Sequence, residues 1–153
     1  SKLTGSYVNS AFSKTEAVLN GFDEAIVLTQ DGHVSEGSAE NLFLVRDGKL
    51  ITPPVTENIL EGITRAVIIQ LAREDLGLVV EERPIDRTEL YVADEAFFCG
   101  TGVQVAAIAH IDRRPVGSGQ LGPVVKKIRD LYFAVVRGQV PKYKACCTPV
   151  YPK

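Results

Sequence analysis

The sequence contains no Met and no Trp, only two His and three Cys, and no long apolar run. A membrane-spanning helix needs about 20 consecutive apolar residues, so we expect none. Two histidines without a Cys-x-x-Cys pair argue against a zinc site. The odd number of cysteines, with Cys146 and Cys147 adjacent, suits a reducing cytoplasm better than a disulfide framework. The net charge of -2 gives no reason to expect nucleic acid or an anionic membrane as a partner.

The composition that remains is that of an ordinary globular domain, with 45% hydrophobic and 24% charged residues. At 153 residues the chain has the length of one domain, long enough to bury roughly two-thirds of its unfolded surface. It begins at Ser1-Lys2-Leu3-Thr4-Gly5 rather than at a methionine. We therefore expect one domain, residues 1–153, cut from a longer protein.

Hydrophobic periodicity predicts helices that alternate with strands. The expected helices span 7–20, 62–75 and 123 to about 138, and the expected strands span 24–29, 41–46, 49–52, 78–82, 96–99 and 103–110. Asp47-Gly48 predicts a hairpin, and Asp86 is expected to cap a short helical turn. Because hairpins occur among the alternating elements, we predict a mixed α/β fold in which helices pack on a mixed sheet.

Two further features of this pattern are expectations about packing. In the first helix, apolar residues recur at a helical period, which predicts an amphipathic helix that helps the other two to form one core. These residues are Val8, Ala11, Phe12, Thr15, Val18 and Leu19. The tail from Gln139 onward contains Pro141, Pro149 and Pro152 and is expected to extend over the surface.

The segment 117–122 is a literal Gly-x-Gly-x-x-Gly just before the last helix. A dinucleotide site would need a preceding strand and an acidic residue about twenty positions further on. The chain has the basic stretch Pro141-Lys142-Tyr143-Lys144 there instead. We interpret the motif as a loop that leads into the helix.

Three other stretches could carry chemistry, and each also has a purely structural explanation. Residues 35–43 place two carboxylates and Asn41 between strands. This stretch could simply form a wide turn, or it could aim a carboxylate at a cation. Residues 60–65 open a helix. This could be a plain helix start capped by Thr64, or its backbone N–H groups could bind a phosphate. Gly100-Thr101-Gly102 lies between two strands. It could be a β-bulge, or it could bring together N–H donors and a hydroxyl that bind a ligand.

Together with Lys2, these stretches follow one another in a fixed order. The order is Lys2-x-x-Gly5-x-Tyr7, Glu36-x-Ser38-x-x-Asn41-Leu42-Phe43, Leu60-x-Gly62-Ile63-Thr64-Arg65 and Asp94-Glu95-x-Phe97-x-x-Gly100-Thr101. This set resembles the fold-type IV enzymes that use pyridoxal 5'-phosphate (PLP). Residues 86–95 and 117–124 are similar to the branched-chain amino-acid aminotransferases in particular, and the resemblance runs from Ser1 to about Val150.

The resemblance implies a fold, a cofactor and a reaction. The chain would be the C-terminal PLP-binding domain, its mixed sheet forming a pseudo-barrel, with the smaller N-terminal domain absent. The full-length parent would be a cytoplasmic homodimer or higher oligomer in branched-chain amino-acid biosynthesis. It would transaminate leucine, isoleucine and valine with 2-oxoglutarate, and the isolated chain would be inactive.

The resemblance also implies a role for individual residues. Lys2 would link covalently to PLP and move the proton, as a desolvated lysine can. Glu36 would keep the pyridine nitrogen protonated, and Tyr7 would hydrogen-bond the phenolic oxygen. Asn41 would chiefly brace the loop of Glu36. The cofactor-binding residues would be Lys2, Tyr7, Glu36, Ala39, Asn41, Leu60, Gly62, Ile63, Thr64, Gly100 and Thr101.

The same resemblance assigns residues to the phosphate and to the substrate. The phosphate would bind the N–H groups of Ile63 and Thr64 and the Thr64 hydroxyl, assisted by Thr101. The substrate carboxylate would bind near Thr101, Gly102 and Val103. The sequence departs from the family at Gly102-Val103-Gln104, where many relatives have small residues followed by an acidic one.

Other functions remain open at this point. Within the superfamily, a D-amino-acid aminotransferase or an aminodeoxychorismate lyase would use the same scaffold. Outside it, the chain could be a non-catalytic binding or dimerisation module, because a lysine at position 2 of a frayed terminus holds no cofactor firmly.

Overall fold

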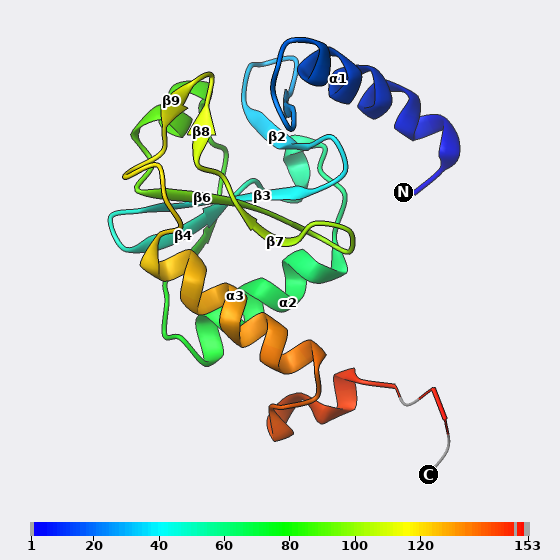
Figure 1. Ribbon diagram of the computed structural model, residues 1–153, viewed down its shortest axis with the longest axis vertical. Helices are drawn as coiled ribbons and strands as arrows, with labels where there is room; N and C mark the ends of the chain where they lie inside the picture. Colours follow the sequence, from blue (N-terminus) through cyan, green and yellow to red (C-terminus); the bar gives the residue numbers. More distant parts are fainter. Residues whose placement is uncertain (1, 149, 152–153) are drawn as a thin grey trace.

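The computed structural model describes residues 2–148 and 150–151, and its elements follow the predicted alternation (Figure 1). The α-helices are α1 (Tyr7–Leu19), α2 (Ile63–Glu74) and α3 (Pro123–Val136). The 3-10 helices are η1 (Thr4–Ser6), η2 (Val55–Glu57), η3 (Arg87–Val92) and η4 (Pro141–Cys146). The strands are β1 (Ile26–Leu28), β2 (Val34–Gly37), β3 (Asn41–Arg46), β4 (Lys49–Thr52), β5 (Val80–Glu82), β6 (Glu95–Gly100), β7 (Gln104–Ala107), β8 (His110–Ile111) and β9 (Arg114–Pro115).

Five strands form the central sheet, in the order β5-β4-β3-β6-β7. The pair β4–β5 is parallel and the other three pairs are antiparallel, so the predicted mixed sheet is confirmed. The strands β5 and β7 lie at its two edges, and β1–β2 and β8–β9 pair separately. The closure expected of a pseudo-barrel is therefore not confirmed.

The hairpin between β3 and β4 forms at the predicted turn. Asp47 and Gly48 have φ angles of 51° and 72°. The tight turn whose twist matches that of paired strands needs two consecutive residues with positive φ. Asp and Gly adopt this conformation at low cost. This turn sets the register that pairs Leu44 with Ile51.

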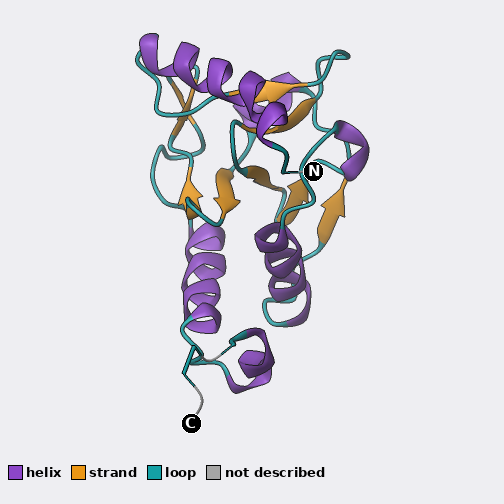
Figure 2. Cartoon of the chain, turned by 90° about the vertical axis from the view of Figure 1, so that its right-hand side faces the viewer, coloured by secondary structure: helices purple, strands orange, loops and turns teal. Residues whose placement is uncertain are grey.

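Alternating side chains of β3 bury both faces of the sheet. Leu42 and Leu44 belong to one apolar cluster, whereas Phe43 and Val45 belong to the other. Helices α2 and α3 lie side by side below the sheet and cover the second cluster (Figures 1 and 2). Within it, the Phe43 and Phe97 rings stack with their centroids 5.0 Å apart. None of the described helices is long and apolar enough to cross a membrane.

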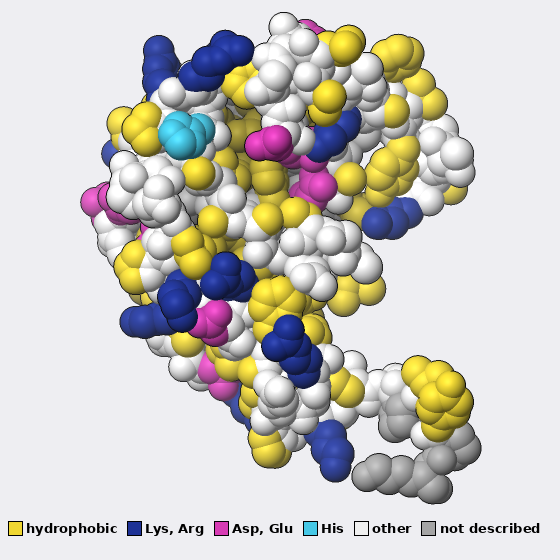
Figure 3. All heavy atoms as spheres, in the orientation of Figure 1, with side chains coloured by type: hydrophobic (Ala, Val, Ile, Leu, Met, Phe, Trp, Pro, Cys, Tyr) yellow, Lys and Arg dark blue, Asp and Glu magenta, His cyan; other side chains and the backbone are white. Residues whose placement is uncertain are grey.

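Helix α1 forms as predicted, but its apolar stripe does not join the core. Phe12 and Leu19 are 72% and 81% exposed, and α1 has no buried residue. The helix instead turns Ser10, Lys14 and other partly buried residues toward the body. Hydrophobic side chains accordingly gather on the outer side of α1 (Figure 3). The expectation of three helices in one core is wrong for α1, since its stripe lacks a partner within the described chain.

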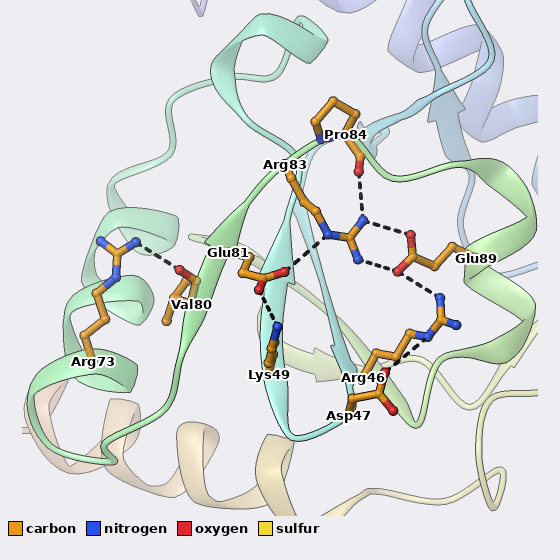
Figure 4. A network of polar contacts seen from close by, with 9 residues as sticks. All are labelled: Arg46, Asp47, Lys49, Arg73, Val80, Glu81, Arg83, Pro84 and Glu89. Carbon is orange, nitrogen blue, oxygen red and sulfur yellow. Dashed lines mark hydrogen bonds and ion pairs between the residues drawn. The ribbon is translucent and has the colours of Figure 1, made fainter.

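An ionic network ties η3 to the strands β3, β4 and β5 (Figure 4). Arg83 donates to both oxygens of Glu89, at 2.9 and 2.6 Å, and Arg46 lies 3.2 Å from the same carboxylate. Arg83 also reaches Glu81, which pairs with Lys49. These charges are partly exposed, so each pair contributes little to stability, and their effect is to fix the position of η3.

Several expected boundaries are wrong in detail. Residues 34–37 form a strand where a loop was predicted, and the strand predicted over 103–110 is divided between β7 and β8. Asp86 is the N-cap residue of η3, as expected, but its side chain makes no capping hydrogen bond and lies 3.6 Å from the His33 ring. The described part of the tail is not extended, because η4 folds back and buries Tyr143, while Pro149 and Pro152 lie outside the described residues.

Candidate functional site

A cavity of about 630 Å³ opens between η1–α1, β2 and the start of α2. It collects residues from four distant parts of the sequence. All eleven residues predicted to bind the cofactor line it: Lys2, Tyr7, Glu36, Ala39, Asn41, Leu60, Gly62, Ile63, Thr64, Gly100 and Thr101.

Glu36 lies on β2, and its carboxylate is held by two donors. The Asn41 carboxamide donates to Glu36 Oε2 at 3.0 Å, and the backbone N–H of Leu60 donates to the same oxygen at 2.9 Å. The expected bracing of Glu36 by Asn41 is therefore confirmed. A carboxylate fixed on a strand suits recognition of a cation in a defined position.

Burial raises the pKa of the Glu36 carboxyl above its ordinary value. The hydrogen bond from Leu60 and the positive charge of Lys2 act in the opposite direction, and the neighbouring Glu40 adds to the rise. A cationic partner stabilises the charged form of such a buried carboxylate, because the ion pair compensates for the solvation that burial removes. The protonated nitrogen of a pyridine ring is such a partner.

The N-terminus of α2 opens into the same cavity without a side-chain cap. Its first turn contains no acidic residue, and Ile63 is 84% exposed. The free N–H groups and the helix dipole favour an anion there, such as a phosphate. The predicted cradle of Ile63 and Thr64 is thus available to a ligand.

Helix α3 provides a contrast, because a side chain already occupies its N-terminus. The Glu95 carboxylate accepts hydrogen bonds from the N–H groups of Val124 and Val125, at 3.0 and 2.8 Å. A Cβ on Gly122 would lie 2.0 Å from Glu95 Cδ, so the last glycine of the Gly-x-Gly-x-x-Gly segment makes room for this carboxylate. The segment is a loop leading into α3, as interpreted from the sequence, and its anion position is filled.

The cavity can accommodate PLP by its chemistry. Its donors and acceptors match the charges along the cofactor: a carboxylate for the ring nitrogen, an uncapped helix N-terminus for the phosphate, and the Lys2 amine for the aldehyde. Lys2 itself is exposed.

The residues predicted to bind substrate divide between two places. Thr101 lines the cavity, but Gly102 and Val103 do not. Val103 lines a second hollow of about 1270 Å³ between α1, β1 and β7. The substrate end of the site is therefore less assembled than the cofactor end.

Sequence reasoning gave no role to several polar residues that line the cavity, among them Ser6, Asn9, Ser10, Thr29, Gln30 and Asn58. Ser10 lies on the polar side of α1, and Asn58 has a left-handed φ of 59° just after η2. Asn is among the residues that tolerate this conformation. The Asn between Glu57 and Ile59 was therefore the one local sign of a turn at this position.

Comparison with known proteins gives a consistent assignment. Residues 2–111 match the family model of amino-transferase class IV. The chain is 51% identical to a probable branched-chain-amino-acid aminotransferase from Aquifex aeolicus, over 99% of this chain and 49% of that protein. It is 46% identical to the branched-chain-amino-acid aminotransferase of Pseudomonas aeruginosa, over 90% of this chain and 44% of the relative.

Solved structures agree with the sequence relatives. The PLP form of the branched-chain amino acid aminotransferase from Thermobaculum terrenum matches with a TM-score of 0.96 and 49% identity, over 99% of this chain and 49% of that one. The branched-chain aminotransferase from Thermoproteus uzoniensis, solved with norvaline, matches with a TM-score of 0.95 and 48% identity, over 99% and 50%.

The fold thus matches that of the fold-type IV aminotransferases, one of which was solved in its PLP form. The chain belongs to the amino-transferase class IV family, and its relatives are branched-chain amino-acid aminotransferases. It spans about half the length of the relatives that it matches.

Proposed function

We propose that this chain is the C-terminal, PLP-binding part of a branched-chain amino-acid aminotransferase and works within a protein about twice its length. The observation that carries the proposal is the arrangement of the cavity, where Glu36 and the uncapped start of α2 accompany Lys2 and Tyr7. A ring nitrogen, a phosphate and an aldehyde would each meet a matching group. The bound cofactor would supply an electron sink for the substrate α-carbon.

Each residue of the chain then has a distinct task. Lys2 would hold the cofactor covalently and carry the proton between the substrate α-carbon and cofactor C4′. Glu36 would keep the ring nitrogen protonated, and Tyr7 would donate to the phenolic oxygen. Thr64 and Ile63 would bind the phosphate through the α2 N-terminus, whose N–H groups have no side-chain cap.

The remaining lining residues would orient the two ligands. Ala39 and Leu60 lie on the cavity wall beside Glu36 and would border the ring. Gly100 and Thr101 close another side of the cavity and would assist at the phosphate. Backbone N–H groups of Gly102 and Val103 would bind the substrate carboxylate once the rest of the pocket is complete.

We assign leucine, isoleucine and valine as amino donors and 2-oxoglutarate as acceptor. Support comes from the relatives, which are named branched-chain-amino-acid aminotransferases. Another structurally similar branched-chain amino acid aminotransferase has been solved with 4-methylvaleric acid and with N-(5'-phosphopyridoxyl)-L-glutamate. The first ligand has a branched apolar chain, and the second carries the skeleton of glutamate.

We also assign the protein to the cytoplasm and to a homo-oligomer. The three cysteines are free, as expected in a reducing compartment. The exposed apolar side of α1, with Phe12 and Leu19, supports a further protein surface against this helix.

Transamination by a chimera tests the proposal. The half of the Thermobaculum terrenum enzyme that this chain does not cover would be joined to residues 1–153, and transfer from leucine to 2-oxoglutarate would be measured. We expect turnover in the ordinary enzyme range of about 1–1000 per second. The 153-residue chain alone should show none, because an open half-site holds no substrate in line.

Other outcomes would replace the proposal. A chimera that acts on D-alanine or on aminodeoxychorismate, but not on leucine, would move the chain to another branch of the family. A folded chimera that binds no PLP would make the chain a non-catalytic module. A chain that is fully active alone would show that the missing half contributes nothing to catalysis.

A further inference from the structure

Asn41 connects the two ends of the cavity through its side chain. It is the first residue of β3, 5% exposed, and pairs with Cys99 across the sheet. Its Nδ2 donates both to Glu36 Oε2, at 3.0 Å, and to the backbone oxygen of Leu60, at 2.8 Å. A buried amide that lost these partners would be left with an unsatisfied donor, so its orientation is fixed.

These bonds close a ring of three residues. Leu60 donates its N–H to the same Glu36 oxygen that Asn41 holds and accepts from Asn41 at its carbonyl. Both donors end on Oε2, so within the described residues Oε1 is the oxygen left for another partner. The carboxylate is therefore fixed in rotation, with one oxygen used by the protein.

The other end of the Asn41 carboxamide touches the start of α2. A Cβ on Gly62 would lie 2.2 Å from Asn41 Oδ1, far inside any normal contact. Gly62 has φ -69° and ψ 134°, which every residue adopts, so glycine is required here for space and not for conformation. The backbone at the N-terminus of α2 thus rests on the Asn41 side chain.

We infer that Asn41 is a positioning residue that sets the distance between the carboxylate facing the cofactor ring and the helix N-terminus facing the cofactor phosphate. One carboxamide holds Glu36 on one side and packs against Gly62 on the other. The two groups would otherwise belong to separate elements, β2 and α2. The inference rests on the proposed function, but the contacts behind it exist without a ligand.

The first arm of the test uses the ligand-free 153-residue chain. Titration of the Glu36 carboxyl by carbon-13 NMR should give a raised pKa in the natural chain, since burial dominates. Asn41→Ala should raise it further, because the charged form loses a donor. Lys2 and Glu40 also act on this carboxyl, and neither is altered by the substitution. Coincident titration curves would overturn the inference.

A matched control separates positioning from general loss of stability. Thr52 is fully buried in β4, and its hydroxyl donates to the Leu42 carbonyl at 2.8 Å, away from the cavity. Thr52→Val should lower the unfolding midpoint, as Asn41→Ala does, and leave the Glu36 titration unchanged. A shift of the same size in both variants would mean that the titration reports only looser packing.

Gly62 tests the connection between the two ends. Gly62→Ala should displace the Asn41 carboxamide and shift the Glu36 titration in the same direction as Asn41→Ala. In the double variant the second substitution should add little, since both act through one contact. Additive shifts, or no effect of Gly62→Ala, would show that the helix start and the carboxylate are independent.

The last arm measures the affinity for PLP by equilibrium dialysis. Inorganic phosphate serves as a probe of the N-terminus of α2 alone. Asn41→Ala should weaken PLP about tenfold or more, equivalent to about 1.4 kcal/mol, and Thr52→Val should not change it. Equal PLP affinity in the natural chain and Asn41→Ala would overturn the positioning role. If the folded chimera bound phosphate but never PLP, the proposed function would fail, while the titration arm would still decide the Asn41 contact.

Discussion

Glu95 accepts a hydrogen bond from the backbone N–H of Val125 at 2.8 Å, and the two residues lie thirty positions apart on β6 and α3. Glu95 is 9% exposed, and its carboxylate also accepts from the N–H of Val124. An acidic side chain at a helix N-terminus satisfies orphan N–H groups and interacts with the helix dipole. This cap attaches α3 to an interior strand of the sheet.

Glu95→Ala should therefore destabilise the chain without affecting the cofactor site. The loss of a cap costs about 0.5–2 kcal/mol, and we expect the upper end because the N–H of Val125 would be left buried. The melting temperature should fall by about 4–8 °C, at about 2–4 °C per kcal/mol. Glu95→Gln, which keeps one acceptor oxygen, should lose less, and PLP affinity should be unchanged in both. A drop in affinity would mean that α3 reaches the cavity.

Glu36→Gln should make the ligand-free chain more stable. Its folded pKa is raised, so between about pH 4.3, the ordinary value, and the raised value the folded state binds more proton than the unfolded chain. Stability then falls as pH rises through this window. The Gln variant lacks that loss, so it should be more stable above the folded pKa and equal to the natural chain in acid. Urea unfolding at several pH values measures this difference.

The same substitution should act in the opposite direction on catalysis. Gln can still accept from Asn41 and Leu60 but cannot keep the ring nitrogen protonated. In the active chimera, Glu36→Gln should lower turnover by several orders of magnitude with much of the PLP affinity retained. Near-normal turnover would remove Glu36 from the proposed role.

The sequence predicted α1, α2, α3 and the β3–β4 hairpin because local signals decide them. Asp47-Gly48 carries the turn and Pro123 the start of α3, and both are readable from neighbouring residues. The cap of α3 by Glu95 was not readable, since the two elements meet only after the sheet has formed. The strand β2 was missed because Ser35, Gly37 and Ser38 are typical of a loop, whereas pairing with β1 makes residues 34–37 a strand.

The candidate site was predictable where motifs follow one another, and less so where the fold brings loops together. Glu36 and Thr64 belong to motifs whose order points to a family. Asn58 and Thr29 reach the cavity from η2 and from the end of β1, and no local pattern links them to it. The direction of the α1 stripe could not be predicted, since periodicity locates an apolar face but not its partner.

Phe12→Ser should leave the stability of the chain almost unchanged. The ring is 72% exposed, and substitutions at such positions usually change the free energy of unfolding by less than about 0.5 kcal/mol. Ile68→Ala, at a fully buried position between α2 and the sheet, should cost about 2–5 kcal/mol. Urea unfolding of both variants makes the comparison. A loss above about 1 kcal/mol for Phe12→Ser would show that α1 is covered in solution, and its dependence on protein concentration would identify a second copy.

Lys2 should be the residue that PLP modifies. It lines the cavity with Glu36, whereas Lys14 is paired with Glu24 at 2.8 Å and Lys49 with Glu81 at 2.7 Å, both outside this cavity. Incubation of the chimera with PLP, borohydride reduction and peptide mapping should place the pyridoxyl group on Lys2. Excess inorganic phosphate should reduce this labelling, because free phosphate and the phosphate group of PLP would compete for the N-terminus of α2. Lys2→Arg keeps the charge but cannot form the covalent link, so it should abolish both the label and turnover. A label on Lys14 or Lys49 that phosphate does not reduce would end the assignment of Lys2.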